Sequence, residues 1–177
     1  MEAGLLIIPE LLNNYNVYND AAKKLIGISG DVELPDFEAI TETIEGAGVL
    51  GEIEAAATGQ FSSMTVKIPF SVLYEDMFTL VNSANGVQLT LRGSMQFMDP
   101  TTGMTNHYPV KVVIRGKCKK YSLGKMTKGK KMDPSVELEI LYIKIDVNSK
   151  PVVELDKANF KYVVNGVDLL EKIRSQC

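Results

Sequence analysis

The chain has 177 residues, of which 45% are hydrophobic and 23% are charged, and its formal net charge at pH 7 is -3. A chain of this length suits a single domain, residues 1–177, that buries roughly 70% of the surface exposed by its unfolded form, so it needs no disulfide or metal for stability. The small negative charge gives no indication of a nucleic-acid or membrane surface, and no apolar run approaches the ~20 residues of a membrane helix.

The opening residues 1–20 are first apolar and then rich in asparagine. They lack the basic segment that begins a signal peptide, and Glu2 and Pro9 interrupt the apolar stretch, so we expect the chain to fold in the cytoplasm. The stretch also does not fit a compact core. We therefore expect an N-terminal arm that becomes ordered only against a neighbouring molecule.

Alternation of apolar and polar residues, which is typical of strands, dominates the chain after this arm. Residues 24–34 and 37–44 are separated by Pro35-Asp36 and predict a hairpin. The following residues 45–63 are rich in glycine and alanine. A loop of that size in a small domain usually has a function, and we expect it to be a second arm that contacts other subunits.

A short strand at residues 64–68 precedes the clearest helix signal of the chain. Ser71 is a good N-cap, and apolar residues continue at helical spacing to about Asn82. Asn85-Gly86 then ends the segment. The pattern predicts one helix that packs against the strands.

The remaining strand patterns fall into two hairpins and are followed by a short helix. Residues 87–97 and 110–118 predict the first hairpin, and residues 135–147 and 152–155 predict the second. Residues 167–175 predict the C-terminal helix, with basic residues near its end. Together the elements predict a mainly β fold, a β-sandwich or partly closed barrel with one packed helix.

The charges are unevenly distributed along the chain. Residues 25–66 contain eight acids and no lysine or arginine, whereas residues 100–132 contain nine bases and no acid. Two solvated faces would account for this pattern. An acidic and a basic surface that meet between successive copies of the chain would account for it equally well.

The sequence offers no pattern that defines a catalytic, cofactor or metal site. Residues 46–51 spell G-x-G-x-x-G without the strand and helix of a nucleotide-binding unit, so a flexible loop is the better interpretation. The single histidine, His107, lies beside a predicted turn and has no identifiable catalytic partner. Cys118 and Cys177 are expected to be free thiols. The lysines of residues 128–131 lack interleaved aromatic residues, which favours a solvated loop over phosphate binding.

The end of the chain carries a more specific pattern. Residues 160–174 read as a strand that ends in Val-Asn-Gly-Val-Asp, followed by a short Leu-Leu-Glu helix with basic residues. This segment resembles the close of the major tail tube protein of contractile-tailed phages. Other pieces follow in the order of that family, so that the resemblance covers nearly the whole chain. They are an Asn-Val-Tyr-Asn-Asp segment (residues 16–20), the first long strand (28–35), a Gly-Ala-Gly loop (46–48) and a helix after Ile-Pro-Phe (68–70). An Arg-Gly-Ser hairpin (92–103) and a Val-Ile-Arg-Gly segment (113–116) come next.

The resemblance implies a tail-tube fold and a structural role without enzymatic activity or cofactors. Members of the family form hexameric rings whose sheets join into one continuous β-barrel, and the rings stack into a tube inside a contractile sheath. The implied partners are further copies of the chain, the tail sheath protein, and baseplate and tail-terminator proteins. DNA is expected to pass through the lumen without specific binding, and no membrane anchoring is expected. The implied location is the virion tail, assembled in the cytoplasm of the bacterial host.

Three sets of residues are candidates for assembly contacts. An acidic wall would repel DNA phosphates, so we expect the acids of the predicted hairpin to line the lumen: Asp31, Glu33, Asp36, Glu38 and Glu42. The two arms are expected to make ring-to-ring contacts through Tyr15, Val17, Tyr18, Gly46, Gly48, Val49 and Leu50. The basic stretch is expected to contact an acidic patch of the next ring, or the sheath, through Lys125, Lys128, Lys130 and Lys131. For the acids and the lysines, plain exposure to solvent is the alternative.

Other classes of protein remain as alternatives. The same fold would serve a headless contractile particle, such as a phage-tail-like bacteriocin or a secretion-system ring, that carries no genome. Genes for sheath and baseplate proteins beside this one would indicate a tail. A monomeric β-sandwich binding module would require a ligand pocket that the sequence does not reveal, and an enzyme would require a catalytic site.

Overall fold

The computed structural model describes residues 7–20 and 22–177. The described residues form, in chain order, strands β1 (Ile8–Asn19), β2 (Lys23–Lys24), β3 (Ala39–Ile44), β4 (Ile53–Phe61) and β5 (Thr65–Pro69), helix α1 (Glu75–Phe78), strands β6 (Val87–Met98), β7 (Thr105–Ser122), β8 (Ser135–Val147), β9 (Lys150–Asp156), β10 (Lys161–Val164) and β11 (Val167–Asp168), and helix α2 (Glu171–Gln176). The predicted mainly β fold with two helices is confirmed.

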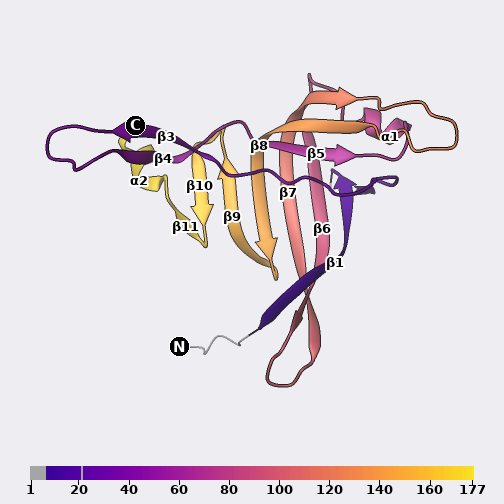
Figure 1. Ribbon diagram of the computed structural model, residues 1–177, viewed down its shortest axis with the longest axis horizontal. Helices are drawn as coiled ribbons and strands as arrows, with labels where there is room; N and C mark the ends of the chain where they lie inside the picture. The colour runs from indigo at the N-terminus through magenta and orange to yellow at the C-terminus, as the bar shows by residue number, and fades with distance from the viewer. Residues whose placement is uncertain (1–6, 21) are drawn as a thin grey trace.

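Most strands belong to one antiparallel sheet, the main sheet. In the described part of the chain its nine strands follow the order β11-β10-β9-β8-β7-β6-β1-β2, and β5 pairs with the first residues of β8. Figure 1 shows β6, β7, β8 and β9 side by side at the centre. Long hairpins produce this order, because β6 pairs with β7 over its whole length and β7 pairs with nearly all of β8.

The core lies on one face of the main sheet. Because side chains alternate between the two faces of a strand, about every second residue points into it. Val136, Leu138 and Ile140 of β8 are buried, and so are Leu89 of β6 and Ile114 of β7. β6 and β8 also have almost the bounds predicted from the period-two pattern. The apolar alternation therefore identified both of these strands.

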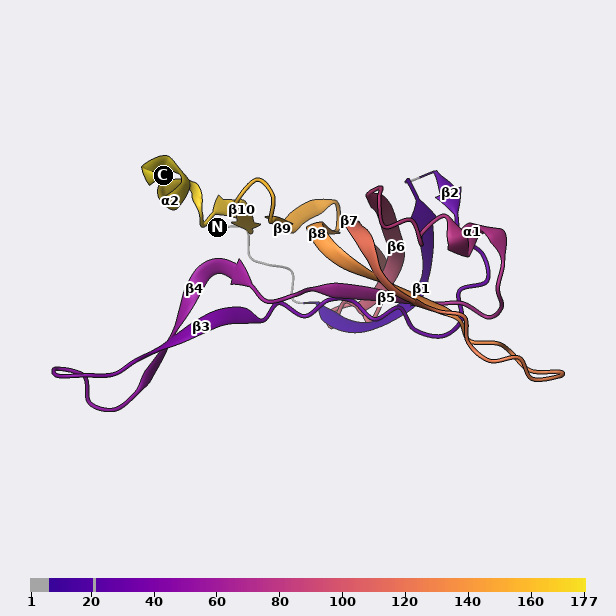
Figure 2. The same cartoon turned by 90° about the horizontal axis from the view of Figure 1, so that it is seen from above.

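β5 and an extended segment, residues 25–38, cover the core from the other side. Backbone bridges join Ile28 to Phe70 and Glu33 to Lys67, so this covering segment runs along β5. Phe70 is fully buried. Figure 2 shows β5 on one side of strands β6 to β9, although β5 itself joins the main sheet by pairing with β8.

The predicted hairpin of residues 24–44 is wrong. Residues 25–38 form the covering segment, and β3 pairs with β4 instead. The turn of this hairpin is residues 45–52, so the predicted loop of residues 45–63 is in large part a strand.

The predicted N-terminal arm is also wrong wherever the structure describes it. β1 pairs with β6 from Ile8 to Asn19, and Val17 is only 1% exposed within the core. Residues 1–6 of the predicted arm lie outside the described residues. β1 is therefore an integral strand of the main sheet.

Both helices are shorter than predicted. The backbone of Ser71 is held by its neighbours, since its amide donates to the carbonyl of Gly27 at 2.8 Å and its carbonyl accepts from the amide of Met132 at 2.9 Å. The carbonyl of Ser71 is thus paired with Met132, whereas the carbonyl of an N-cap accepts the first hydrogen bond of its helix, and α1 starts only at Glu75. α2 begins after β11, whose two residues pair with β10.

Candidate assembly surfaces

The β3–β4 hairpin, residues 39–61, forms an arm that projects beyond the main sheet (Figures 1 and 2). Ile44 and Ile53 lie opposite each other near its end and are 49% and 54% exposed. Leu50 in the turn is fully exposed. Exposed apolar side chains on a projecting hairpin are typical of a surface that another molecule covers.

Aromatic and aliphatic contacts fix the base of the arm to the main sheet. The ring of Phe61 meets Phe37 and Tyr162 edge to face, with centroids 5.4 and 5.1 Å apart. Gly59, with φ of 68°, lies against buried Leu170, and a Cβ at this position would come within 2.9 Å of the leucine methyl groups. The arm is therefore anchored at its base and unsupported at its end.

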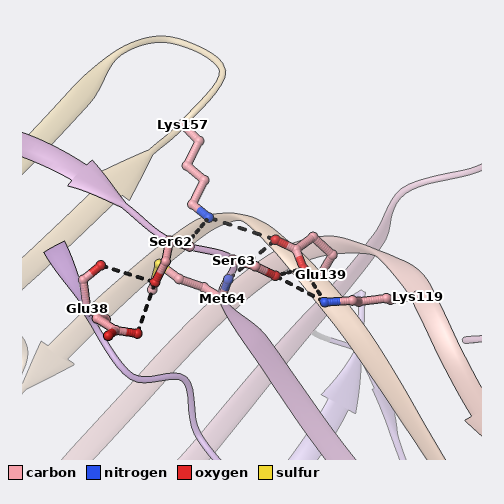
Figure 3. Close-up of polar contacts among 7 residues, drawn as sticks. All are labelled: Glu38, Ser62, Ser63, Met64, Lys119, Glu139 and Lys157. Atoms are coloured by element: carbon pink, nitrogen blue, oxygen red, sulfur yellow. Dashed lines mark hydrogen bonds and ion pairs between the residues drawn. The ribbon is translucent and has the colours of Figure 1, made fainter. Parts of the chain in front are cut away.

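Glu139 of β8 is the centre of a polar cluster at the base of the arm (Figure 3). Its Oε2 accepts hydrogen bonds from Ser63 Oγ at 2.7 Å and Lys119 Nζ at 3.4 Å, and its Oε1 accepts one from the amide of Met64 at 3.3 Å. Lys157 Nζ lies 4.0 Å from Oε1. The carboxylate thus joins β8 to β7, to the β9–β10 turn and to the chain that leaves the arm.

Burial opposes the ionisation of Glu139, but the hydrogen bonds from Ser63 and Lys119 outweigh it and hold the pKa of the carboxyl below its ordinary value of 4.5. A pKa that is lower in the folded than in the unfolded chain means that the ionised group stabilises the fold above about pH 4.5. This contribution is lost as the pH falls through the folded pKa.

Replacement of Glu139 by glutamine should lower the melting temperature by about 2–4 °C at neutral pH, because it removes the ionic hydrogen bonds. The difference from the wild type should shrink below pH 4.5, and thermal melting across pH checks both effects. Glu137→Gln is the matched control, since it removes a carboxylate from the same strand outside the cluster. A pH-independent difference would contradict the assignment.

The main sheet ends in an open edge on each side. β1 pairs with β2 only at Tyr18 and Asn19, and no other described strand lies along residues 8–17 on that side. At the opposite side, the only described strand beyond β10 is β11, with two residues. Leu11 and Leu12 on β1 are 53% and 50% exposed. An open strand edge is a template for pairing with another chain.

The face of the main sheet that is turned away from the core is polar, and its charges are partly paired. The guanidinium of Arg115 lies 3.9 Å from the ring centre of Tyr142, and Lys161 forms an ion pair with Glu154 at 3.2 Å. This surface has a signal in the sequence. The polar positions of residues 87–97 are the signal for it.

The structure separates the acids predicted for the lumen wall. The covering segment carries four of them, Asp31, Glu33, Asp36 and Glu38, and the arm carries Glu42. Glu33 is 3.6 Å from Lys67 Nζ, and a carboxylate oxygen of Glu38 accepts a hydrogen bond from Ser62 at 3.3 Å. The acids therefore do not form a hairpin of their own, and their place in the lumen stays a prediction.

The residues predicted for ring-to-ring contacts fall into two groups. Val17 is buried in the core, so its assignment is wrong. On the same strand, Tyr15 donates a hydrogen bond from its hydroxyl to the carbonyl of Gly30, and Tyr18 lies beneath Arg92. The other group lies together in the turn of the arm: Gly46, Gly48, Val49 and Leu50. The role of these residues between rings stays a prediction.

The lysines predicted as a contact patch lie together on the β7–β8 loop, residues 123–134, which we call the basic loop: Lys125, Lys128, Lys130 and Lys131. The loop projects from the opposite end of the molecule to the arm (Figure 1). Met126 on it is 87% exposed, and Leu123 is half exposed. Its partner stays a prediction.

Two kinds of feature are absent from the described residues, a metal-holding cluster and a helix that could cross a membrane. Within residues 7–20 and 22–177, no group of three or more histidine, cysteine, aspartate and glutamate residues could hold a metal ion. No helix in this part of the chain is long and apolar enough to cross a membrane. Cys118 is half-buried and Cys177 is exposed, and both are free thiols in the described structure.

Two comparisons of sequence indicate the same family, and a comparison of structures finds a similar fold. The family model described as phage tail tube protein FII matches residues 9–177. The tail tube protein of Escherichia phage P2 is 29% identical over 153 residues, which cover 84% of this chain and 86% of the relative. A solved structure of the sheath/tube terminator of an extracellular contractile injection system (PVC) has a similar fold, with a TM-score of 0.55 and 11% identity over 78% of this chain and 96% of that chain. The chain therefore belongs to the phage tail tube protein FII family.

Proposed function

We propose that this tail tube protein joins edge to edge into rings of six copies, and that the rings stack into the inner tube of a contractile phage tail. The observation that carries the proposal is a main sheet with an open edge on each side. Pairing of one open edge with the opposite edge of the next copy is a head-to-tail contact, which generates a ring when the rotation closes. Ring closure turns six sheets into one barrel and leaves no strand edge exposed.

The same geometry supports a structural role for every surface of the ring. The polar face of the main sheet would turn inward, and the covering segment would turn outward toward the tail sheath. The ends of the tube would meet baseplate and tail-terminator proteins. In this proposal the protein has no catalytic task, and it is assembled into the virion tail in the cytoplasm of the host.

Native mass spectrometry of the purified protein tests the ring. We expect a species of six copies to form as the protein concentration rises, and no closed ring with a different number of copies. A stable monomer or dimer over the whole concentration range would overturn the proposal.

Two surfaces compete for the lumen wall. The predicted acids lie mainly on the covering segment, on the side of the molecule that carries β5. The polar face of the main sheet lies on the other side. Closure through the sheet edges favours the polar face, because the other face of the sheet is occupied by the core. The pairing of its charges also suits a wall along which DNA slides without specific binding.

Particles with neutralised side chains distinguish the two surfaces. Asp146→Asn with Glu154→Gln leaves unpaired lysines on the polar face, which should attract phosphates and slow the release of DNA several-fold. Glu33→Gln with Glu38→Gln and Glu42→Gln should leave the release rate unchanged. The rate of DNA ejection, followed with a DNA-binding dye, measures both. If the Glu33→Gln, Glu38→Gln and Glu42→Gln variant slowed ejection and the polar-face variant did not, the acids would lie on the lumen wall.

A headless contractile particle is the second candidate, and the fold similarity to a terminator of an extracellular contractile injection system supports it. Such a particle would use the same ring and tube without a genome. Purified particles with heads that contain DNA would indicate the phage tail, whereas sheathed tubes without heads would indicate the second candidate.

A further inference from the structure

The arm and the basic loop carry opposite charge at opposite ends of the molecule. Four acids lie on or beside the turn of the arm: Glu42, Glu45, Glu52 and Glu54. Four lysines lie on the basic loop: Lys125, Lys128, Lys130 and Lys131. Within the described part of this copy, none of these side chains takes part in an ion pair. Both charge clusters are therefore available to another molecule.

Apolar side chains accompany the charges on both surfaces. Ile44, Leu50 and Ile53 are exposed on the arm, and Leu123 and Met126 are exposed on the basic loop. Opposite charges alone give a weak and salt-sensitive attraction at a protein surface. Apolar area beside complementary charge is the composition of an interface core with a polar rim.

The two surfaces cannot meet within one copy. Figures 1 and 2 show the arm extending past the end of the main sheet that carries β10 and β11, and the basic loop extending past the end that carries β1. These are also the ends at which the main sheet has its open edges. An edge-to-edge contact between two copies would therefore bring the arm of one copy to the end of the next copy from which the basic loop projects.

We infer that the arm of one copy docks on the basic loop of a second copy of this chain. The inference rests on the proposed ring and adds the surface that fastens neighbouring copies outside the sheet. Glutamates of the arm would face lysines of the basic loop, while Leu50 and Met126 would bury apolar area between the two copies. The anchor at Glu139 and the aromatic base of the arm would hold it in the direction of its neighbour.

Charge reversal tests the inference, because each contact in a polymer of identical copies uses one arm and one basic loop. Reversal of the arm (E42K, E45K, E52K and E54K) should raise the concentration needed for ring or tube formation about tenfold or more. Reversal of the basic loop (K125E, K128E, K130E and K131E) should have the same effect. Both reversals in one chain should restore assembly, since the contacting charges are again opposite.

Lys117→Glu with Lys172→Glu is the control, because it reverses two exposed lysines outside both surfaces and should leave assembly unchanged. Circular dichroism confirms that each variant is folded. The inference is overturned if either reversal assembles like the wild type, or if the double reversal is as defective as the single ones. A basic-loop variant that forms normal tubes but fails to recruit sheath would assign the loop to the sheath instead. The proposed function fails separately, if the wild type itself forms no rings.

Discussion

Replacement of Leu11 and Leu12 by lysine should raise the concentration needed for ring formation by about 100-fold or more. Both side chains are half exposed on β1, on the open edge of the main sheet, and they would become buried when another copy pairs there. Loss of burial of the exposed half of each leucine costs about 1 kcal/mol, and the desolvation of two charged side chains at the paired edge opposes pairing by about a further 1 kcal/mol or more. Sedimentation velocity across a concentration series measures the shift.

The fold of this variant should be retained, because lysine is tolerated at an exposed position of an edge strand. Leu11→Met with Leu12→Met is the matched control and should assemble like the wild type. Normal ring formation by the lysine variant would show that the open edge of β1 is not the contact between copies.

Replacement of Gly116 by valine should reduce the free energy of unfolding by about 3 kcal/mol or prevent folding. Gly116 lies where β7 and β8 change register, and a Cβ there would come within 2.2 Å of the carbonyl oxygen of Glu139. That oxygen belongs to the backbone and cannot move without breaking the pairing of the two central strands. Urea unfolding, or the yield of soluble protein, measures the loss.

Gly86→Ala is the control for this change. An added Cβ at Gly86 would meet the carbonyl oxygen of Gly116 at an ordinary contact distance of 3.8 Å. The alanine variant should therefore lose far less stability than the valine variant. Equal stability of the valine variant and the wild type would mean that the β7–β8 register is not fixed by this glycine.

Strands with a buried and a polar face were predictable from the sequence. The alternation of residues 135–147 gives β8 with its observed bounds, and that of residues 87–97 gives nearly all of β6. Pairing between distant segments was less accessible. Pro35-Asp36 has the composition of a turn, but the chain continues through it in the covering segment, and Ala39–Ile44 finds its partner across a glycine-rich turn instead.

The candidate assembly surfaces were only partly predictable for a related reason. Charge asymmetry along the sequence located the basic loop and the acids of the arm. The sequence predicts an arm where β1 forms an open edge, because an edge strand that is half exposed lacks a strong apolar period. The cluster around Glu139 draws side chains from four separate parts of the chain, and no local pattern indicates such a meeting.

Cryo-electron microscopy of tubes formed by the purified protein tests the central claim most directly. We expect rings of six copies in which β1 of one copy lies beside the β9–β11 end of the next, with the polar face of the main sheet around the lumen. A tube in which the β1 edges face solvent, or in which copies join through other elements, would contradict this account.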